Sequence, residues 1–196
     1  EGVDPRRAEE VAGRGCAAGE PVACALEDKL REVRRLAVAA ATDCTRGDQD
    51  ACALRAKCLD RGWGVAVARE QATALYDSAC TAGSGRACAG LVLRSQPQGV
   101  DARRHRLLER GCTLGSPDAC AELGSSALAR GDRAEAERLL VPACEAHVLS
   151  ACNTLFDDAY LTSDPRADRY HALFCGCPGA QCDDVPPRAP RFEDTP

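Results

Sequence analysis

The sequence predicts an all-α protein, an α/α solenoid of five to six helix–turn–helix repeats that are cross-linked by disulfides. Three observations lead to this prediction. Apolar residues make up 45% of the chain but aromatic residues only 4%, so the apolar content is mostly Ala, Leu, Val and Cys, which suits closely packed helices better than β-sandwiches. Cysteines occur in pairs eight residues apart. The pairs recur at steps of 28 to 36 residues, a period typical of helical solenoids.

Ten of the 14 cysteines form five pairs with the same separation of eight residues. The segment GCTLGSPDAC, residues 111–120, is one copy. A sixth segment, FCGCPGAQC, has the same form with one residue deleted. The pairs are Cys16–Cys24, Cys44–Cys52, Cys80–Cys88, Cys112–Cys120, Cys144–Cys152 and, in the shortened sixth segment, Cys175–Cys182.

The spacing indicates what each pair does. An unbroken helix would hold the two Cα atoms about 12 Å apart, and a strand roughly 27 Å apart. A disulfide needs a Cα–Cα distance of about 4.4–6.8 Å, so the chain must reverse between the cysteines. A glycine three residues after the first cysteine can supply the reversal by adopting a positive φ as a helix C-terminal cap. These turn glycines are Gly19, Gly47, Gly83 and Gly115.

Two other roles for the cysteines fit the spacing less well. Zinc sites use cysteines two to four residues apart, closed by four ligands, so we predict no metal site and no cofactor. A thioredoxin-like redox centre needs C-x-x-C, and Cys175-Gly-Cys177 is the nearest approach to it. Structural disulfides are the favoured interpretation. Such a cysteine excess is typical of an oxidising compartment.

Two helical stretches are expected between successive corners. The first begins at the second cysteine of a pair, at residues 87–95, 119–131 and 151–161, with Leu91, Leu123 and Leu155 three residues after that cysteine. The second leads into the next pair, at residues 68–80, 101–112 and 132–144. There, a leucine lies five residues before the cysteine, and an alanine often eight before it, on one helix face. These residues are Leu75, Leu107 and Leu139, with Ala72 and Ala136.

The segment Ala51–Val92, with Gly62-x-Gly64-Val65 between its two helices, resembles a Sel-1-like repeat. The cysteine pairs make the chain similar to the disulfide-rich branch of that family, typified by the Helicobacter cysteine-rich proteins. The resemblance covers about Val11 to Cys182. We therefore expect a solenoid over residues 1–182 and a Pro-rich, disordered tail over residues 183–196, with a Pro-rich ligand for a partner as the alternative for the tail.

Some positions depart from the repeat pattern. The first unit has only 28 residues, and Glu27 and Arg55 stand where later units have leucine. His147 replaces the turn glycine of the fifth corner, so that turn must be strained or take a different geometry. Cys58 and Cys177 fall outside the pairing. The alternatives for them are a packed thiol, an intermolecular bridge, or a rearranged pairing with Cys175 and Cys182.

The usual catalytic spacings are missing. The sequence has no S-x-x-K, G-x-S-x-G, H-E-x-x-H or P-loop motif, and its histidines, His105, His147 and His171, lie in separate units. The formal charge of −5 and the lack of a basic block argue against nucleic acid as a partner. The longest weakly polar stretch, Leu36–Thr42, is too short to cross a bilayer.

Function is predicted by analogy at the level of the fold. We expect a secreted or periplasmic bacterial scaffold that binds a protein or peptide and has no catalysis of its own. Because the chain contains no methionine, we expect that an upstream segment was removed, which leaves room for envelope association. The resemblance also implies an alternative, since some cysteine-rich relatives are described as penicillin-binding or weakly β-lactamase-like, although this sequence offers no identifiable nucleophile for such an activity.

Overall fold

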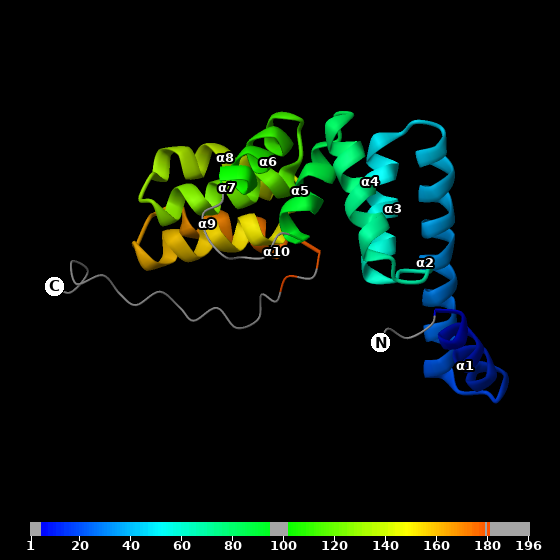
Figure 1. The fold of residues 1–196 in the computed structure, drawn as a ribbon. Helices are drawn as coiled ribbons and strands as arrows, with labels where there is room; N and C mark the ends of the chain where they lie inside the picture. Colours follow the sequence, from blue (N-terminus) through cyan, green and yellow to red (C-terminus); the bar gives the residue numbers. More distant parts are fainter. Residues whose placement is uncertain (1–4, 95–101, 179, 181–196) are drawn as a thin grey trace. The chain divides into compact units, whose positions relative to one another are not determined.

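The computed structural model describes residues 5–94, 102–178 and 180. That part of the chain holds ten helices and no strand (Figure 1). It divides into two compact units, Glu1–Ser116 and Pro117–Pro196. The expected tail, residues 183–196, lies outside the described residues. The helices are α1 Pro5–Ala17, α2 Pro21–Thr45, α3 Gln49–Arg61, α4 Arg69–Thr81, α5 Gly85–Arg94, α6 Ala102–Thr113, α7 Pro117–Ala129, α8 Arg133–Glu145, α9 Leu149–Leu161 and α10 Ala167–Cys175.

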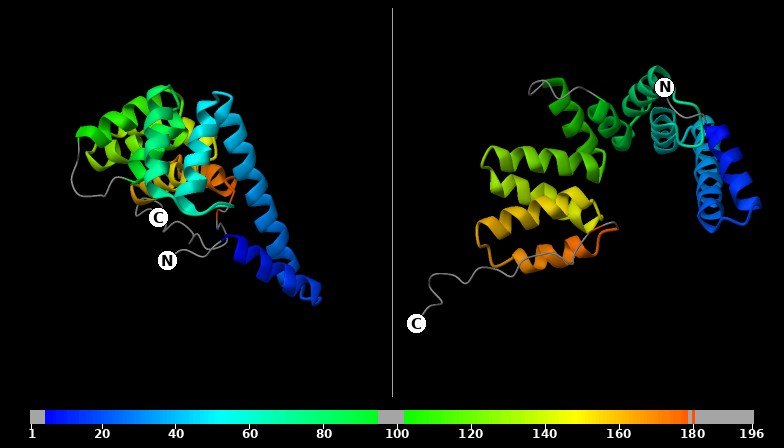
Figure 2. Two further views of the ribbon diagram at one scale, coloured as in Figure 1. Left: turned by 45° about the vertical axis from the view of Figure 1, so that its right-hand side comes forward. Right: turned by 90° about the horizontal axis from the view of Figure 1, so that it is seen from below.

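Within each unit the helices pack in the order of the sequence. In the first unit α1 contacts α2, α2 contacts α3, α3 contacts both α4 and α5, α4 contacts α5, and α5 contacts α6. In the second unit α7 and α8 form a pair against which α9 packs, and α10 packs on α9 and α8 (Figure 2). Contacts between a helix and its next two neighbours are those of a solenoid. The predicted all-α solenoid architecture is confirmed.

Four of the cysteine corners join two helices by the same pattern of backbone hydrogen bonds. Between α4 and α5, the N–H of Gly83 donates to the carbonyl of Cys80 (3.1 Å), and the N–H of Ser84 donates to the carbonyl of Ala79 (2.9 Å). These two bonds form a Schellman motif, which ends α4. The N–H of Cys88 then donates to the carbonyl of Ser84 (3.2 Å), the first bond of α5. Ser84 therefore belongs to both motifs, because it closes one helix and caps the next.

This pattern explains the spacing of eight residues. The first cysteine lies two residues before the C-cap of one helix, and the second lies four residues after the N-cap of the next. Because the two motifs share one residue, the N-cap of the second helix always lies two residues after the C-cap of the first. The number of residues from one cysteine to the other is therefore fixed at eight. The same three bonds occur at the α1–α2, α2–α3 and α8–α9 corners. In the four corners from Cys16–Cys24 to Cys144–Cys152 whose geometry is described, the paired Cα atoms are 4.4–4.7 Å apart.

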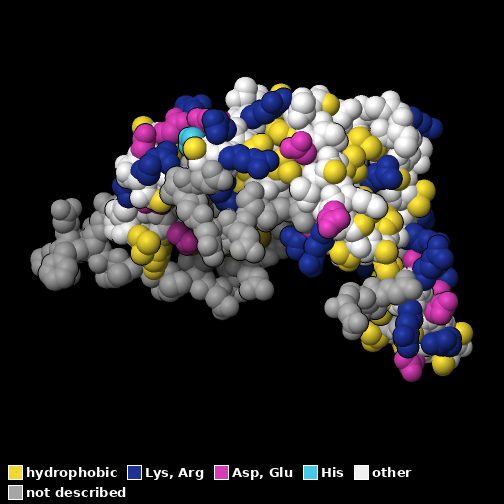
Figure 3. Space-filling model, in the orientation of Figure 1, with side chains coloured by type: hydrophobic (Ala, Val, Ile, Leu, Met, Phe, Trp, Pro, Cys, Tyr) yellow, Lys and Arg dark blue, Asp and Glu magenta, His cyan; other side chains and the backbone are white. Residues whose placement is uncertain are grey.

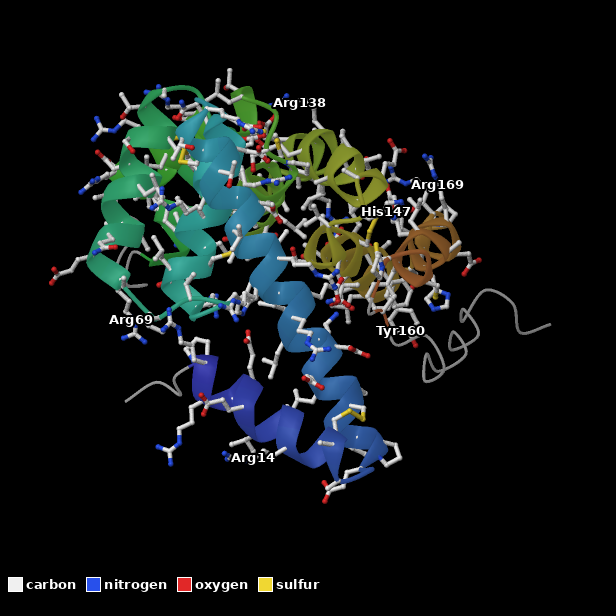
Figure 4. The ribbon with its side chains drawn as sticks, turned by 90° about the vertical axis from the view of Figure 1, so that its right-hand side faces the viewer. Arg14, Arg69, Arg138, His147, Tyr160 and Arg169 are labelled. Atoms are coloured by element: carbon white, nitrogen blue, oxygen red, sulfur yellow. A yellow bond between two sulfur atoms is a disulfide. The ribbon has the colours of Figure 1, made fainter. Side chains whose placement is uncertain are left out.

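The residue in the middle of each corner has a positive φ. The four turn glycines have φ angles between 81° and 109°, and a Cβ added to any of them would meet nothing within 4 Å. Glycine is therefore favoured by backbone conformation and not by lack of space. His147 occupies the same position at the α8–α9 corner with a φ of 62° (Figure 4). That corner keeps the shared geometry, and the left-handed conformation costs a non-glycine residue about 1 kcal/mol.

The cores of both units consist mainly of small residues and half-cystines. Alanine supplies most of the fully buried positions, such as Ala56, Ala72 and Ala151, each 0% exposed. Cys88 and Cys152 are equally buried, so their disulfides pack inside the cores and do not merely span the surface. Side chains this small allow close approach between helices, but each one removes little apolar surface from water.

The leucines of the predicted repeat pattern differ in how deeply they are buried. Leu91, Leu123 and Leu155 are buried as expected, but Leu75 and Leu107 are only half-buried. The deeper position lies one residue later, four before the cysteine. It is occupied by Tyr76, Leu108 and Leu140. Positions three and four residues along a helix share a face, so the pattern alone could not distinguish them.

The 28-residue first step contains one helix instead of a helix pair. The 25-residue α2 runs directly from the Cys16–Cys24 corner to the Cys44–Cys52 corner. The loop after α3 packs against it. Gly62 caps α3 with a φ of 72°, and Gly64, with a φ of 65°, lies so close to α2 that an added Cβ would be 2.6 Å from the Cα of Arg34.

Replacing Gly64 by alanine should therefore destabilise the protein more than replacing Gly115. At Gly115 an added Cβ contacts nothing, so the cost comes only from the positive φ. At Gly64 the residue also has a positive φ, and the added Cβ overlaps the backbone of α2. We expect a loss of about 1 kcal/mol for Gly115→Ala and of about 2–4 kcal/mol for Gly64→Ala in the free energy of unfolding by urea. Equal losses would contradict the docking of this loop on α2.

Candidate binding groove and cysteine sites

An open groove of about 360 Å³ lies between α3 and α4 in the first unit. Its apolar surface comes from Leu59, Ala74 and Leu75, and its polar groups come from Arg55, Gln71 and Ser78. The two α3 residues are four apart, and the four α4 residues follow helical spacing. Each set therefore lies on one face of its helix.

Arg55 marks this repeat as different from the others. It lies three residues after Cys52, the position at which the three later repeats bury Leu91, Leu123 and Leu155. Arg55 is instead half-buried and lines the groove. A charged residue at a leucine position was noted in the sequence, but its position in a groove could not be read from the sequence.

The groove suits a ligand that carries both an apolar group and a carboxylate. Half-buried Leu59 and Leu75 offer apolar contact area. The guanidinium of Arg55 can bind a carboxylate with two parallel hydrogen bonds. Gln71 can donate and accept hydrogen bonds with a peptide backbone, and the hydroxyl of Ser78, which donates to the carbonyl of Leu75 (3.0 Å), can accept one.

The first unit also exposes large apolar side chains on α1 and α2 and on the α3–α4 loop. Figure 3 shows hydrophobic side chains on its visible face. The ammonium of Lys57 on α3 lies 5.2 Å from the ring centre of Trp63 in the loop, a cation–π contact. The exposed apolar residues here are Val11, Val22, Leu26, Leu36, Val38, Trp63 and Val67, with exposed fractions of 40–82%.

The structure assigns most of the cysteines to disulfides. Cys16 bonds Cys24, Cys44 bonds Cys52, Cys80 bonds Cys88, and Cys144 bonds Cys152. Cys112, Cys120 and Cys175 are disulfide-bonded as well. Cys182, the partner that we predict for Cys175, lies outside the described residues.

The two remaining described cysteines, Cys58 and Cys177, are free thiols, and both are buried. Burial raises the pKa of the Cys58 thiol above its ordinary value, and nearby Lys57 only partly opposes this shift. The sulfur of Cys177 lies 3.1 Å from the sulfur of Cys152, which is itself part of the corner disulfide.

Charged groups link the helices of the second unit. Arg166, just before α10, donates to both carboxylate oxygens of Glu137 on α8 (2.6 and 2.7 Å). It also binds Asp164, and these hydrogen bonds lower the pKa of Asp164 to about 2. Arg133 on α8 pairs with Asp158 on α9 at 2.9 Å. These exposed contacts connect α8 to α9 and to the segment that leads into α10.

Two of the histidines, His105 and His171, and the serine Ser84 make local contacts. His105 lies 3.3 Å from Glu109 on the same helix, and His171 lies 3.4 Å from the sulfur of Cys175. The hydroxyl of Ser84 accepts from the N–H of Ala87 and donates to Asp50, as an N-cap residue does.

Among the described residues, no group of three or more His, Cys, Asp or Glu side chains is arranged to hold a metal ion. None of the helices within residues 5–94 and 102–178 combines the length and the hydrophobicity that a bilayer crossing requires.

Comparison with solved structures places the fold. The chain is similar to the crystal structure of a Sel1 repeat protein from Oxalobacter formigenes, with a TM-score of 0.58 and 21% sequence identity over 88% of this chain and 80% of that one. The fold is thus that of a Sel1 repeat solenoid, as the sequence resemblance implied. No model of a protein family and no curated protein sequence matches this chain.

Cys58 should be unreactive in the folded protein. Its side chain is 1% exposed and its pKa is raised, so the fraction of nucleophilic thiolate at pH 8 is small. We expect iodoacetamide to leave the tryptic peptide 58–61 unmodified in native protein and to modify it fully in 6 M guanidinium, a standard denaturing condition. Rapid native modification would contradict a packed thiol.

Proposed function

We propose that this chain is an extracytoplasmic bacterial scaffold, secreted or periplasmic, that binds a protein or peptide through the α3–α4 groove and has no catalysis of its own. The observation that carries the proposal is the groove itself, in which Arg55 replaces the leucine of the other repeats. Solenoids generally bind partners through surfaces of this kind.

The disulfides support the proposed compartment. Bonds such as Cys80–Cys88 persist in oxidising environments, whereas thiol buffers keep most cytosolic cysteines reduced. Their placement in the cores supports a structural role. A cytosolic chain with this sequence would have to keep several buried cysteine pairs unlinked.

The groove chemistry supports an acidic partner segment with at least one apolar side chain. Leu59 and Leu75 would contact the apolar side chain, and Arg55 would bind the carboxylate of an acidic residue or of a chain end. A half-buried pair of this kind is less screened than one on an open surface. The charge of the partner segment should therefore have a strong effect on its binding affinity.

Site-specific photocrosslinking tests this proposal. A benzoylphenylalanine at Gln71, in the groove, should capture a partner from envelope extract or culture supernatant of the source organism. The same residue at Thr73, exposed elsewhere on α4, should capture much less. Equal capture at both positions, or none at Gln71, would contradict binding in the groove.

Charge reversal gives the quantitative test. Arg55→Glu should weaken binding of the captured partner by about tenfold or more, because it replaces attraction to a carboxylate by repulsion. Arg35→Glu is the matched control, since Arg35 is exposed on α2 and does not line the groove. Titration calorimetry measures both. Similar affinities for the two variants would rule out the role of Arg55.

The absence of catalysis is tested separately. Oxidised protein incubated with nitrocefin and with a fluorescent penicillin should show neither turnover nor a covalent adduct. Either signal, if it survives purification of a denatured and refolded sample, would favour the penicillin-binding alternative and would leave the groove experiment unaffected.

A further inference from the structure

Three sulfur atoms gather at the α8–α9 corner of the second unit. Cys144 and Cys152 form the corner disulfide, and the thiol of Cys177 lies 3.1 Å from the sulfur of Cys152. Cys177 follows α10, 25 residues beyond Cys152. The three side chains are at most 4% exposed, so their sulfur atoms meet inside the core.

The thiol of Cys177 is held in place by its own backbone surroundings. Its N–H donates to the carbonyl of Phe174 (2.9 Å), which continues the last turn of α10. Its sulfur lies 3.5 Å from the carbonyl of Leu173. A thiol in contact with one particular sulfur of a disulfide is positioned for exchange, because the reaction begins with attack of a thiolate on that sulfur.

We propose that Cys144, Cys152 and Cys177 form an intramolecular thiol–disulfide exchange site. The thiolate of Cys177 attacks the sulfur of Cys152, a Cys152–Cys177 bond forms, and the Cys144–Cys152 bond breaks. Cys144 leaves as a thiolate and takes up the proton that Cys177 released. The number of disulfides and of thiols is unchanged, so the step needs no oxidant or reductant.

The corner affected is the one with a strained turn. His147 holds a φ of 62° at the position where the other four corners have glycine. With Cys144 released, the bond across that turn is gone, and the new bond instead links α9 to the segment after α10. Exchange thus moves a cross-link from within one corner to between successive elements, and it frees the turn that least favours its conformation.

Peptide mapping distinguishes the two isomers directly. Trypsin leaves Cys144 and Cys152 together in peptide 139–166, and Cys177 in peptide 170–188. The native pairing keeps these peptides separate, whereas the exchanged pairing joins them. The folded, oxidised wild type is incubated at pH 8, quenched with acid, and alkylated with N-ethylmaleimide in denaturant before digestion.

We expect joined peptides in the wild type, rising with incubation to a plateau, with the maleimide label moving from Cys177 to Cys144. Fragment spectra separate Cys177 from Cys175 in the same peptide. Cys177→Ser should abolish the joined species. Cys58→Ser, which removes the buried thiol of the first unit, should not change it. Separate peptides at every time, with the label on Cys177 alone, would overturn the proposal.

The variant Cys144→Ser tests the contact independently of the exchange rate. It leaves Cys152 and Cys177 as the two thiols in contact, so oxidation should join the two peptides nearly completely. Label on both Cys152 and Cys177 in this variant would overturn the assigned geometry. The wild-type map remains decisive if the variant fails to fold, because it uses the unaltered chain.

Discussion

The structure depends on the disulfides that close the cysteine corners, such as those at the α4–α5 and α8–α9 junctions, where one helix ends and the next begins. A Schellman motif and an N-cap share one residue there, as Ser84 does between α4 and α5. The cysteines consequently face each other with Cα atoms 4.4–4.7 Å apart. Each nine-residue loop closed in this way contributes about 2–3 kcal/mol in the chain-entropy model. A few such bonds match the total stability of an ordinary domain, about 5–15 kcal/mol.

The reliance on cross-links follows from the composition. Alanines such as Ala56 and Ala151 fill the cores, together with a few larger buried residues such as Tyr76 and Leu140. Helices with so little apolar surface gain little from burial alone. The half-cystines offset this small gain in two ways. Cys88 and Cys152 fill space in the cores, and their disulfides restrict the conformations of the unfolded chain.

The corners could be predicted from sequence because their spacing has no freedom, whereas features that depend on packing could not. Leu75 and Leu107 were predicted to lie on one helix face, but the spacing could not show that residues 76 and 108 are the more deeply buried ones, since helical periodicity tolerates either. The 28-residue first step did not reveal that α2 is a single helix. Arg55 broke the leucine pattern visibly, yet only the packing of α3 on α4 shows a groove beside it. The contact of Cys177 with Cys152 likewise depends on how α10 packs on α9.

Urea unfolding with and without reductant, followed by circular dichroism at 222 nm, tests the central claim most directly. The account predicts that the oxidised chain unfolds in a cooperative transition and that the fully reduced chain has lost most of its helical signal before urea is added, because the corner bonds carry about as much free energy as the whole fold. A reduced chain with the same helical content and nearly the same urea midpoint would show that packing alone holds the repeats together.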